Sequence, residues 1–491
     1  MRTLLFSLVL MGCSGSDLIC GPGTVELDGQ CLPDAPADSG GSSQDTATSQ
    51  DTAPPEDTAT SQDTAPPEDT ATPAKEPALV YLLAGQSNMV GVGEVMALPP
   101  SLRGPIEDVQ LYWSGREGWT DLQPSSDYSS SYATYMGPEV TFGRAMKDAH
   151  PDRDVYLIKH ADGGTALADW WNPGADPSDT PNQGDGYTTF RDTVTQGLGR
   201  LDNEGVDFEI AGMIWMQGES DAYDATYAHA YEANLTHFID RIREDVGVED
   251  MPFIIGEIHC EDVCPYRDTV VAAERAVAAN DANVRSFDTL DLERFPTDYW
   301  HYAGIGQRVL GERFAQSLLD EDELSAFPTA AIEITGSYTY SYYGAYTVGW
   351  SFRVLEDVQV TDLGVYDLWG DGLYHNTIVG IWEEDTQELL IEADVYGSSL
   401  YATTWHQAFR YVGIDETVLP AGNYRIGNVS YSWTPDYYVY NAGITESASV
   451  DWLGSRHYSG NVLTFPTVDG GATQEYAAWF GPNFLFEAVS E

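Results

Sequence analysis

The feature that most constrains the fold is a regular alternation of strand-like and helix-like segments between residues 78 and 322. Short apolar runs alternate with longer stretches in which apolar residues recur every three or four positions, as in helices. The expected strands are 79–84, 155–158, 210–216, 253–258 and 284–290, and the expected helices lie near 139–149, 188–203, 225–245, 267–280 and 304–319. This order predicts an α/β domain with a parallel sheet covered by helices on both faces. Its functional residues are expected at the carboxyl ends of the strands.

The pattern changes near residue 330, where helical periodicity ends. Short runs rich in Tyr, Val, Thr and Ile follow, separated by Gly, Asp and Asn. The expected strands are 347–354, 358–366, 377–383, 388–396, 408–414, 422–429 and 483–489. They predict an antiparallel β-sandwich over 330–491.

The beginning of the chain indicates export. Arg2 precedes an apolar stretch that is too short to span a bilayer and ends in Leu-Met-Gly-Cys13. This ending resembles a bacterial lipobox, so 1–12 is expected to be a lipoprotein signal peptide and Cys13 the lipid-bearing start of a segment over 13–33. An ordinary secretory peptide is the alternative. We expect an exported protein, lipid-anchored at the bacterial cell envelope or surface.

Residues 34–77 consist almost entirely of Asp, Glu, Thr, Ala, Ser, Pro, Gln and Gly, and the block SQDTAPPEDTAT occurs twice, at 49–60 and 61–72. Such a stretch has little apolar surface to bury and is expected to be a disordered linker. It would hold the folded domains away from the membrane.

Four cysteines remain if Cys13 carries lipid, and an even number in an exported protein indicates disulfides. Proximity favours pairing Cys20 with Cys31 and Cys260 with Cys264. For the second pair, the alternative is a metal site that also uses His259.

The chain is strongly acidic, with 22 Lys+Arg against 78 Asp+Glu. Up to Pro77 there are 13 of these acids and 2 of the bases, so 65 acids and 20 bases remain beyond it. A field of this sign repels nucleic acid and anionic lipid. We therefore expect no nucleic-acid partner, and membrane contact only through the lipid on Cys13. A neutral substrate fits this charge, although a solubility or salt adaptation with no role in specificity is the favoured explanation.

Three clusters of residues that could take part in catalysis follow predicted strands or precede a predicted helix. Ser87 lies in the glycine-flanked turn GQSNM after strand 79–84, a position that suits a nucleophile. His301 follows Asp298 by three residues, so the carboxylate can reach the imidazole and orient it. Gly163 and Gln217 follow two further strands. With the Ser87 N–H, the Gly163 N–H and the Gln217 amide would form an oxyanion hole.

The motifs GQSNM, GGT followed by Trp-Trp, WMQGESDA, and DYWH with GIGQRVLG occur in this order over roughly 78–322. Together they resemble the carbohydrate acetylesterases of the SGNH-hydrolase superfamily, in particular sialate O-acetylesterase-like and acetylxylan esterase-like proteins. The resemblance implies a three-layer α/β/α fold with a flavodoxin-like parallel sheet and hydrolysis of acetyl esters without a metal or other cofactor. It also implies that Ser87 is the nucleophile, His301 the base and Asp298 its partner, with Glu219 as the alternative acid.

The resemblance thus predicts an esterase that removes O-acetyl groups from a polysaccharide or glycan through an acetyl-enzyme. Two alternatives remain: another carboxylester hydrolase on the same fold, or a surface adhesion protein whose hydrolase domain is degenerate. The segments GWSFRV, VQVTDLGVYD and GDGLYHNTIVGIW resemble a β-sandwich of unknown function found on bacterial surface and secreted proteins. Its tyrosines and tryptophans would either bind glycan or pack in the sandwich.

Overall fold

The computed structural model describes most of the chain beyond residue 75 and one short hairpin before it. The described residues are 24–27, 30–33, 76–125, 134–260, 263–295, 298–321, 323–335, 339–341, 344–368, 372–396, 405–406, 409–431, 436, 438–440, 442–470 and 481–489. The predicted signal peptide, Cys13, the Cys20 half of the first disulfide and nearly all of the linker lie outside them.

Residues 1–71 and 72–491 form two compact units. In the first unit, β1 (Thr24–Leu27) and β2 (Gln30–Pro33) form an antiparallel hairpin.

The second unit contains a seven-stranded sheet among its described residues, with the order β11-β10-β9-β3-β8-β5-β6. Its neighbours pair in parallel, except that β6 is antiparallel to β5. The strands are β3 (Ala78–Gly85), β5 (Ile106–Trp113), β6 (Thr120–Leu122), β8 (Val155–Ala161), β9 (Phe208–Met216), β10 (Phe253–Gly256) and β11 (Val284–Phe287). The five strands expected from the sequence are confirmed, and every residue of the central strand β3 is buried.

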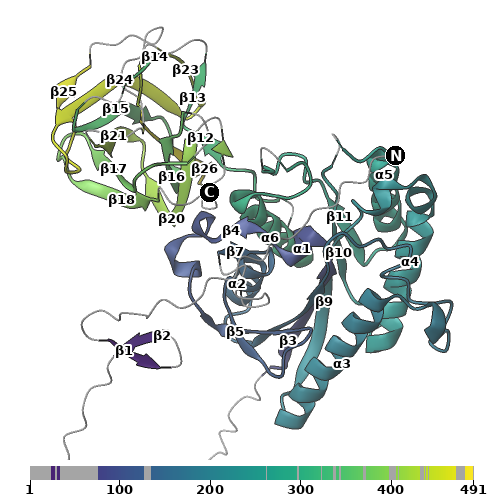
Figure 1. Ribbon diagram of the computed structural model, residues 1–491. Helices are drawn as coiled ribbons and strands as arrows, with labels where there is room; N and C mark the ends of the chain where they lie inside the picture. Colours follow the sequence, from purple (N-terminus) through teal and green to yellow (C-terminus); the bar gives the residue numbers. More distant parts are fainter. Residues whose placement is uncertain are drawn as a thin grey trace, which may run out of the picture. The chain divides into compact units, whose positions relative to one another are not determined.

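Helices cover both faces of this sheet (Figure 1). The helices α2 and α6 pack against each other, as do α4 and α5, and α3 packs on β8. Their bounds are α2 (Glu139–Ala149), α3 (Asp185–Glu204), α4 (Ala225–Val246), α5 (Arg267–Asn280) and α6 (Gly304–Leu319). The predicted helices are therefore confirmed. In the part of the chain that the structure describes, no helix has both the length and the apolar character needed to cross a membrane.

Smaller elements complete this part of the unit. The short helix α1 (Ser87–Val90) follows β3, and β4 (Gly93–Glu94) pairs with β7 (Tyr135–Met136). The 3-10 turns within the described residues are η1 (Val95–Ala97), η2 (Pro100–Leu102), η4 (Thr180–Asn182) and η5 (Asp221–Tyr223).

Beyond α6 the described residues form antiparallel sheets, as the sequence predicts. One sheet has the order β12-β26-β16-β20-β19 and the other the order β18-β17-β21-β15-β24-β25. The first comprises β12 (Thr329–Ala330), β16 (Val358–Tyr366), β19 (Trp405–His406), β20 (Phe409–Leu419) and β26 (Pro482–Ala488). The second comprises β15 (Tyr346–Val354), β17 (Thr377–Glu383), β18 (Leu389–Val395), β21 (Gly422–Ser430), β24 (Val450–Ser459) and β25 (Val468–Asp469).

Aromatic side chains fill the space between these two sheets. Trp350 of β15 stacks on Phe484 of β26 with 6.0 Å between ring centroids, and Phe352 also contacts Phe484. Two further pairs flank the sheets: β13 (Ile332–Thr335) with β23 (Gly443–Glu446), and β14 (Thr339–Ser341) with β22 (Tyr438–Tyr440).

A buried ion pair connects α6 to the β-rich region within this second unit. Arg308 of α6 donates to both carboxylate oxygens of Asp362 in β16, at 3.1 and 2.8 Å. Arg308 is 5% exposed and Asp362 is fully buried. A buried guanidinium needs such a partner, so the sandwich contributes to the stability of the helix that follows His301.

Candidate active site

The predicted nucleophile lies where the central strand ends. Ser87 is half-buried and is the first residue of α1, directly after β3. The preceding Gln86 N–H donates to Met216 O at the end of β9, at 2.9 Å. Gly85 has φ +153°, and a Cβ on it would lie 2.1 Å from Met216 O, so only glycine allows β3 and β9 to approach this closely. The turn therefore holds Ser87 at the carboxyl edge of the sheet.

Gly163 lies beside Ser87. It follows β8, and a Cβ added to it would lie 3.6 Å from the Ser87 Cβ. A side chain at this position would thus face the nucleophile. Because the first N–H groups of a helix lack partners inside the helix, the Ser87 N–H is suited to bind an oxyanion next to Gly163.

Gln217 is placed differently from its expected role as an oxyanion donor. The side chain is fully buried, and its Nε2 donates to Thr165 O at 2.9 Å and to Asp221 Oδ2 at 2.7 Å. A third acceptor, Gln86 Oε1, lies 3.3 Å from Nε2, so the two amide hydrogens are directed at acceptors within the protein. The structure therefore uses Gln217 to connect the loop after β8 with the turn after β9, whereas an oxyanion donor would direct a hydrogen toward Ser87.

Asp221 is a further residue at this junction, and sequence reasoning gave it no role. Besides Gln217, its buried carboxylate accepts hydrogen bonds from Leu167 N at 2.7 Å and Ala168 N at 3.1 Å. Burial raises its pKa, and these donors oppose that shift. The available signal was an acid four residues after Gln217 in the same motif. Asp221 fixes the segment that follows Gly163.

His301 and Asp298 form the expected pair. The His301 Nδ1 lies 2.6 Å from Asp298 Oδ2, and Asp298 Oδ1 accepts from Trp300 N at 3.0 Å. Burial pushes the pKa of Asp298 upward, but the hydrogen bonds from His301 and Trp300 outweigh it and hold the pKa below its ordinary value. An ionised Asp298 that accepts from Nδ1 leaves Nε2 as the proton acceptor of the ring.

Asn88 joins the two halves of the site, and it too was missed by sequence reasoning. Its Nδ2 donates to Trp300 O at 2.9 Å, and its Oδ1 accepts from Tyr302 N at 3.1 Å. The residue next to Ser87 therefore binds the backbone on both sides of His301. Because Asn88 is 1% exposed, water competes little for these bonds.

Glu219, the alternative acid, supports Asn88. Its Oε1 accepts from Asn88 Nδ2 at 2.7 Å, and Glu219 is 2% exposed. Burial raises the pKa of Glu219. Since the His301 Nδ1 is bonded to Asp298, the geometry favours Asp298 as the orienting acid and gives Glu219 a position behind Asn88.

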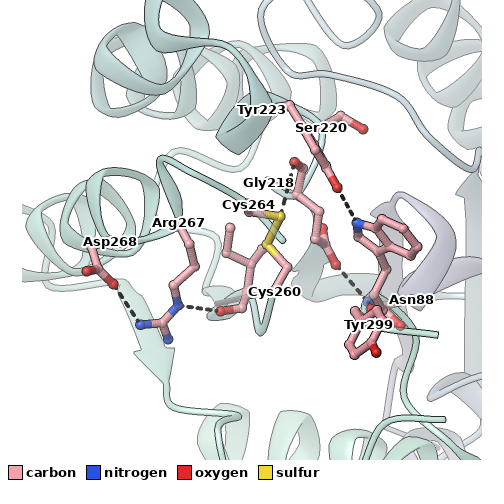
Figure 2. Close-up of a disulfide and its surroundings, with 12 residues drawn as sticks. Asn88, Gly218, Ser220, Tyr223, Cys260, Cys264, Arg267, Asp268 and Tyr299 are labelled. Carbon is pink, nitrogen blue, oxygen red and sulfur yellow. Dashed lines mark hydrogen bonds and ion pairs between the residues drawn. A yellow bond between two sulfur atoms is a disulfide. The ribbon is translucent and has the colours of Figure 1, made fainter. Parts of the chain in front are cut away.

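The second predicted disulfide lies close to the backbone of Glu219. Cys260 and Cys264 are bonded, which confirms this pairing, and Cys264 Sγ lies 3.9 Å from Glu219 O. Figure 2 shows the disulfide on one side of the 218–220 turn and Asn88 on the other. The alternative of a metal site with His259 is wrong, because sulfurs joined in a disulfide cannot act as thiolate ligands.

Comparisons with known proteins concern the part of the chain that contains this site. Residues 77–320 match the family model described as carbohydrate esterase, sialic acid-specific acetylesterase. A probable carbohydrate esterase of Arabidopsis thaliana is 26% identical over 259 residues, which cover 50% of this chain and 91% of the relative.

Two solved structures are also similar. An Arabidopsis thaliana protein is 24% identical, with a TM-score of 0.42 and coverage of 50% of this chain and 99% of that chain. A carbohydrate acetylesterase from Xanthomonas citri is 17% identical, with a TM-score of 0.38 and coverage of 70% and 80%. The family match places residues 77–320 of this chain in the carbohydrate esterase, sialic acid-specific acetylesterase family.

Proposed function

We propose that this chain is a serine esterase that removes O-acetyl groups from a carbohydrate through an acetyl-enzyme. The observation that carries the proposal is that Asn88, next to Ser87, binds both neighbours of His301, whose imidazole is paired with Asp298. A nucleophile, a base and an orienting acid are thus linked by short contacts, of which one is buried and two are partly buried. Family membership indicates the acyl group and the substrate class, which are acetyl esters of carbohydrate.

In the first half of the reaction, Ser87 Oγ attacks the acetyl carbonyl while His301 Nε2 takes the serine proton. The backbone N–H groups of Ser87 and Gly163 stabilise the oxyanion of the tetrahedral intermediate. Its collapse breaks the bond to the sugar oxygen, which receives the proton from His301. The sugar leaves as an alcohol, and the acetyl group remains on Ser87.

In the second half, His301 removes a proton from water, and the water oxygen attacks the acetyl carbon. Collapse of the second intermediate returns the proton to Ser87 and releases acetate. Asp298 stabilises the imidazolium that forms in both halves.

The sheet topology supports a three-layer SGNH arrangement as part of this proposal. Counted in chain order, the strands β8-β3-β9-β10-β11 have the order 2-1-3-4-5, which is the flavodoxin-like order. The strands β5 and β6 extend that core. We further propose export with a lipid on Cys13, and a carbohydrate-binding role for the sandwich, both from the sequence patterns.

The test is the rate of acetate release from 4-nitrophenyl acetate and from an acetylated oligosaccharide. We expect Ser87→Ala to lower both rates by about 10³-fold or more, as when one member of a triad is removed. A matched circular dichroism spectrum would show that the fold is retained. A Ser87→Ala variant with full activity on both esters would refute the serine mechanism and leave a scaffold or a different catalytic group as the explanation.

A further inference from the structure

Three large aromatic side chains, Tyr223, Tyr299 and Trp300, are exposed near the catalytic pair, and Tyr223 and Trp300 are hydrogen-bonded to each other. Tyr223 is 47% exposed and Trp300 is 36% exposed. Large aromatic side chains are mostly buried in folded proteins, and adjoining exposed ones mark a binding surface more often than isolated ones do. Trp300 directly precedes His301, and Tyr223 ends the η5 turn that begins just after Glu219.

The Tyr223 and Trp300 side chains are hydrogen-bonded to each other, and neighbouring residues fix the Trp300 backbone. Trp300 Nε1 donates to Tyr223 Oη at 2.8 Å, a bond that the reader can follow from Tyr223 in Figure 2. The Trp300 backbone is fixed by Asp298 at its N–H and by Asn88 at its carbonyl. The surface is therefore preorganised by the same contacts that position His301, and a ligand loses little binding energy to ordering it.

The chemistry of this surface points to a sugar ring. Because the indole N–H already has an acceptor in Tyr223, what it offers a ligand is chiefly apolar ring surface bordered by a phenol oxygen. A pyranose presents the complementary surface, with a face of C–H groups and a rim of hydroxyls. Resting on the proposed esterase function, we infer that Tyr223 and Trp300 bind a neutral pyranose of the acetylated substrate beside Ser87.

The charges nearby favour a neutral ring over an anionic sugar. The cationic side chains near the motifs are engaged with the protein. Lys159 is buried against Glu139 at 2.7 Å, and Arg308 is paired with Asp362. Arg294 donates to Tyr299 O at 2.7 Å. We call Tyr223 and Trp300 the aromatic platform. An acid adjoins each of its residues: Asp224 follows Tyr223 in the sequence, and Asp298 accepts a hydrogen bond from the Trp300 N–H.

The experiment compares kcat/KM on a soluble acetylated xylo-oligosaccharide with kcat/KM on 4-nitrophenyl acetate, which lacks a sugar ring. We expect Tyr223→Ala to lower the ratio of the two values by about tenfold, because the sugar loses an aromatic contact that the small ester never makes. Tyr223→Phe keeps the ring and should restore most of the ratio. Tyr223→Phe is therefore the matched control for the loss of the aromatic ring.

A lower ratio in Tyr223→Ala alone supports the platform. Equal ratios in wild type and Tyr223→Ala would overturn it, as would a loss that is the same on both esters. A wild-type preference for O-acetylated N-acetylneuraminic acid over the xylo-oligosaccharide would overturn the assignment to a neutral ring. Failure of the esterase function itself would be visible separately, as activity retained by Ser87→Ala on 4-nitrophenyl acetate.

Discussion

Replacing Asp298 by Asn should lower kcat far more than replacing Glu219 by Gln. The introduced amide would keep an oxygen for the Trp300 N–H but would place an NH2 group against His301 Nδ1, where Asp298 Oδ2 now lies 2.6 Å away. Nδ1 would then have to accept, and the proton would move to Nε2, which could no longer take the proton of Ser87. Loss of the correct tautomer in a triad costs about 10⁴-fold in kcat, or about 5 kcal/mol of barrier.

Glu219→Gln keeps the contact that the structure gives to Glu219. The Gln oxygen can still accept from Asn88 Nδ2, which now lies 2.7 Å from Glu219 Oε1. What is lost is the difference between a carboxyl and an amide oxygen as acceptor, about 1 kcal/mol, so kcat should fall by less than about tenfold. Glu219→Ala leaves Asn88 without this acceptor and should be the more damaging of the two Glu219 variants.

The assay is steady-state hydrolysis of 4-nitrophenyl acetate across the pH range, with thermal unfolding as a check on folding. The reasoning predicts the order wild type, Glu219→Gln, Glu219→Ala, Asp298→Asn, from most to least active. If Glu219→Gln were slower than Asp298→Asn, Glu219 would be the acid that supports His301, and the interpretation of the 2.6 Å pair would be wrong.

Three further predictions follow from buried contacts. Asn88→Asp should lower kcat by about 100-fold with little change in KM. An oxygen would replace Nδ2, which now faces two acceptor oxygens, and the resulting repulsion would shift His301. An unchanged kcat in stopped-flow assays would contradict this. Burial raises the pKa of Glu94 from 4.5 to about 8. Between these two pH values the folded protein keeps the Glu94 proton and the unfolded chain releases it, so the free energy of unfolding falls as the pH rises. Glu94→Gln keeps an acceptor for Gly304 N, and its free energy of unfolding should therefore increase relative to wild type between about pH 5 and pH 8 in urea titrations; a constant difference would refute the assignment. Asp362→Ala leaves Arg308 buried without its carboxylate and should cost about 3–5 kcal/mol in the same titrations, whereas a cost under about 1 kcal/mol would mean that water replaces the pair.

The parts of the fold that depend on local pattern could be predicted from the sequence. The central strand β3 is apolar throughout because helices cover both faces of the sheet. The buried residues of α3, α4 and α5 recur at helical spacing, whereas α6 is buried on nearly all sides. Strand β5 escaped prediction because its exposed positions, Glu107 and Asp108, interrupt the apolar run. Strand β24 was missed for a similar reason, since its polar and apolar residues do not alternate regularly.

The site was predictable to the extent that its motifs are local. Asp298 and His301 are three residues apart, so their contact could be expected from spacing alone. The contacts of Asn88 join residues more than 130 positions apart, and no local pattern reveals them. The choice between Asp298 and Glu219, and the buried position of Gln217, likewise depend on how loops from different strands meet at the sheet edge.

The central claim, that Ser87 is the nucleophile, is tested most directly by covalent labelling. The enzyme would be incubated with a serine-directed aryl phosphonate, and the modified residue would be located by peptide mass spectrometry while activity is followed. We predict one adduct on Ser87, formed in step with the loss of esterase activity and absent from His301→Ala, in which the hydroxyl is no longer activated. Full inactivation with the adduct on another residue, or stoichiometric labelling of Ser87 with activity intact, would contradict the mechanism.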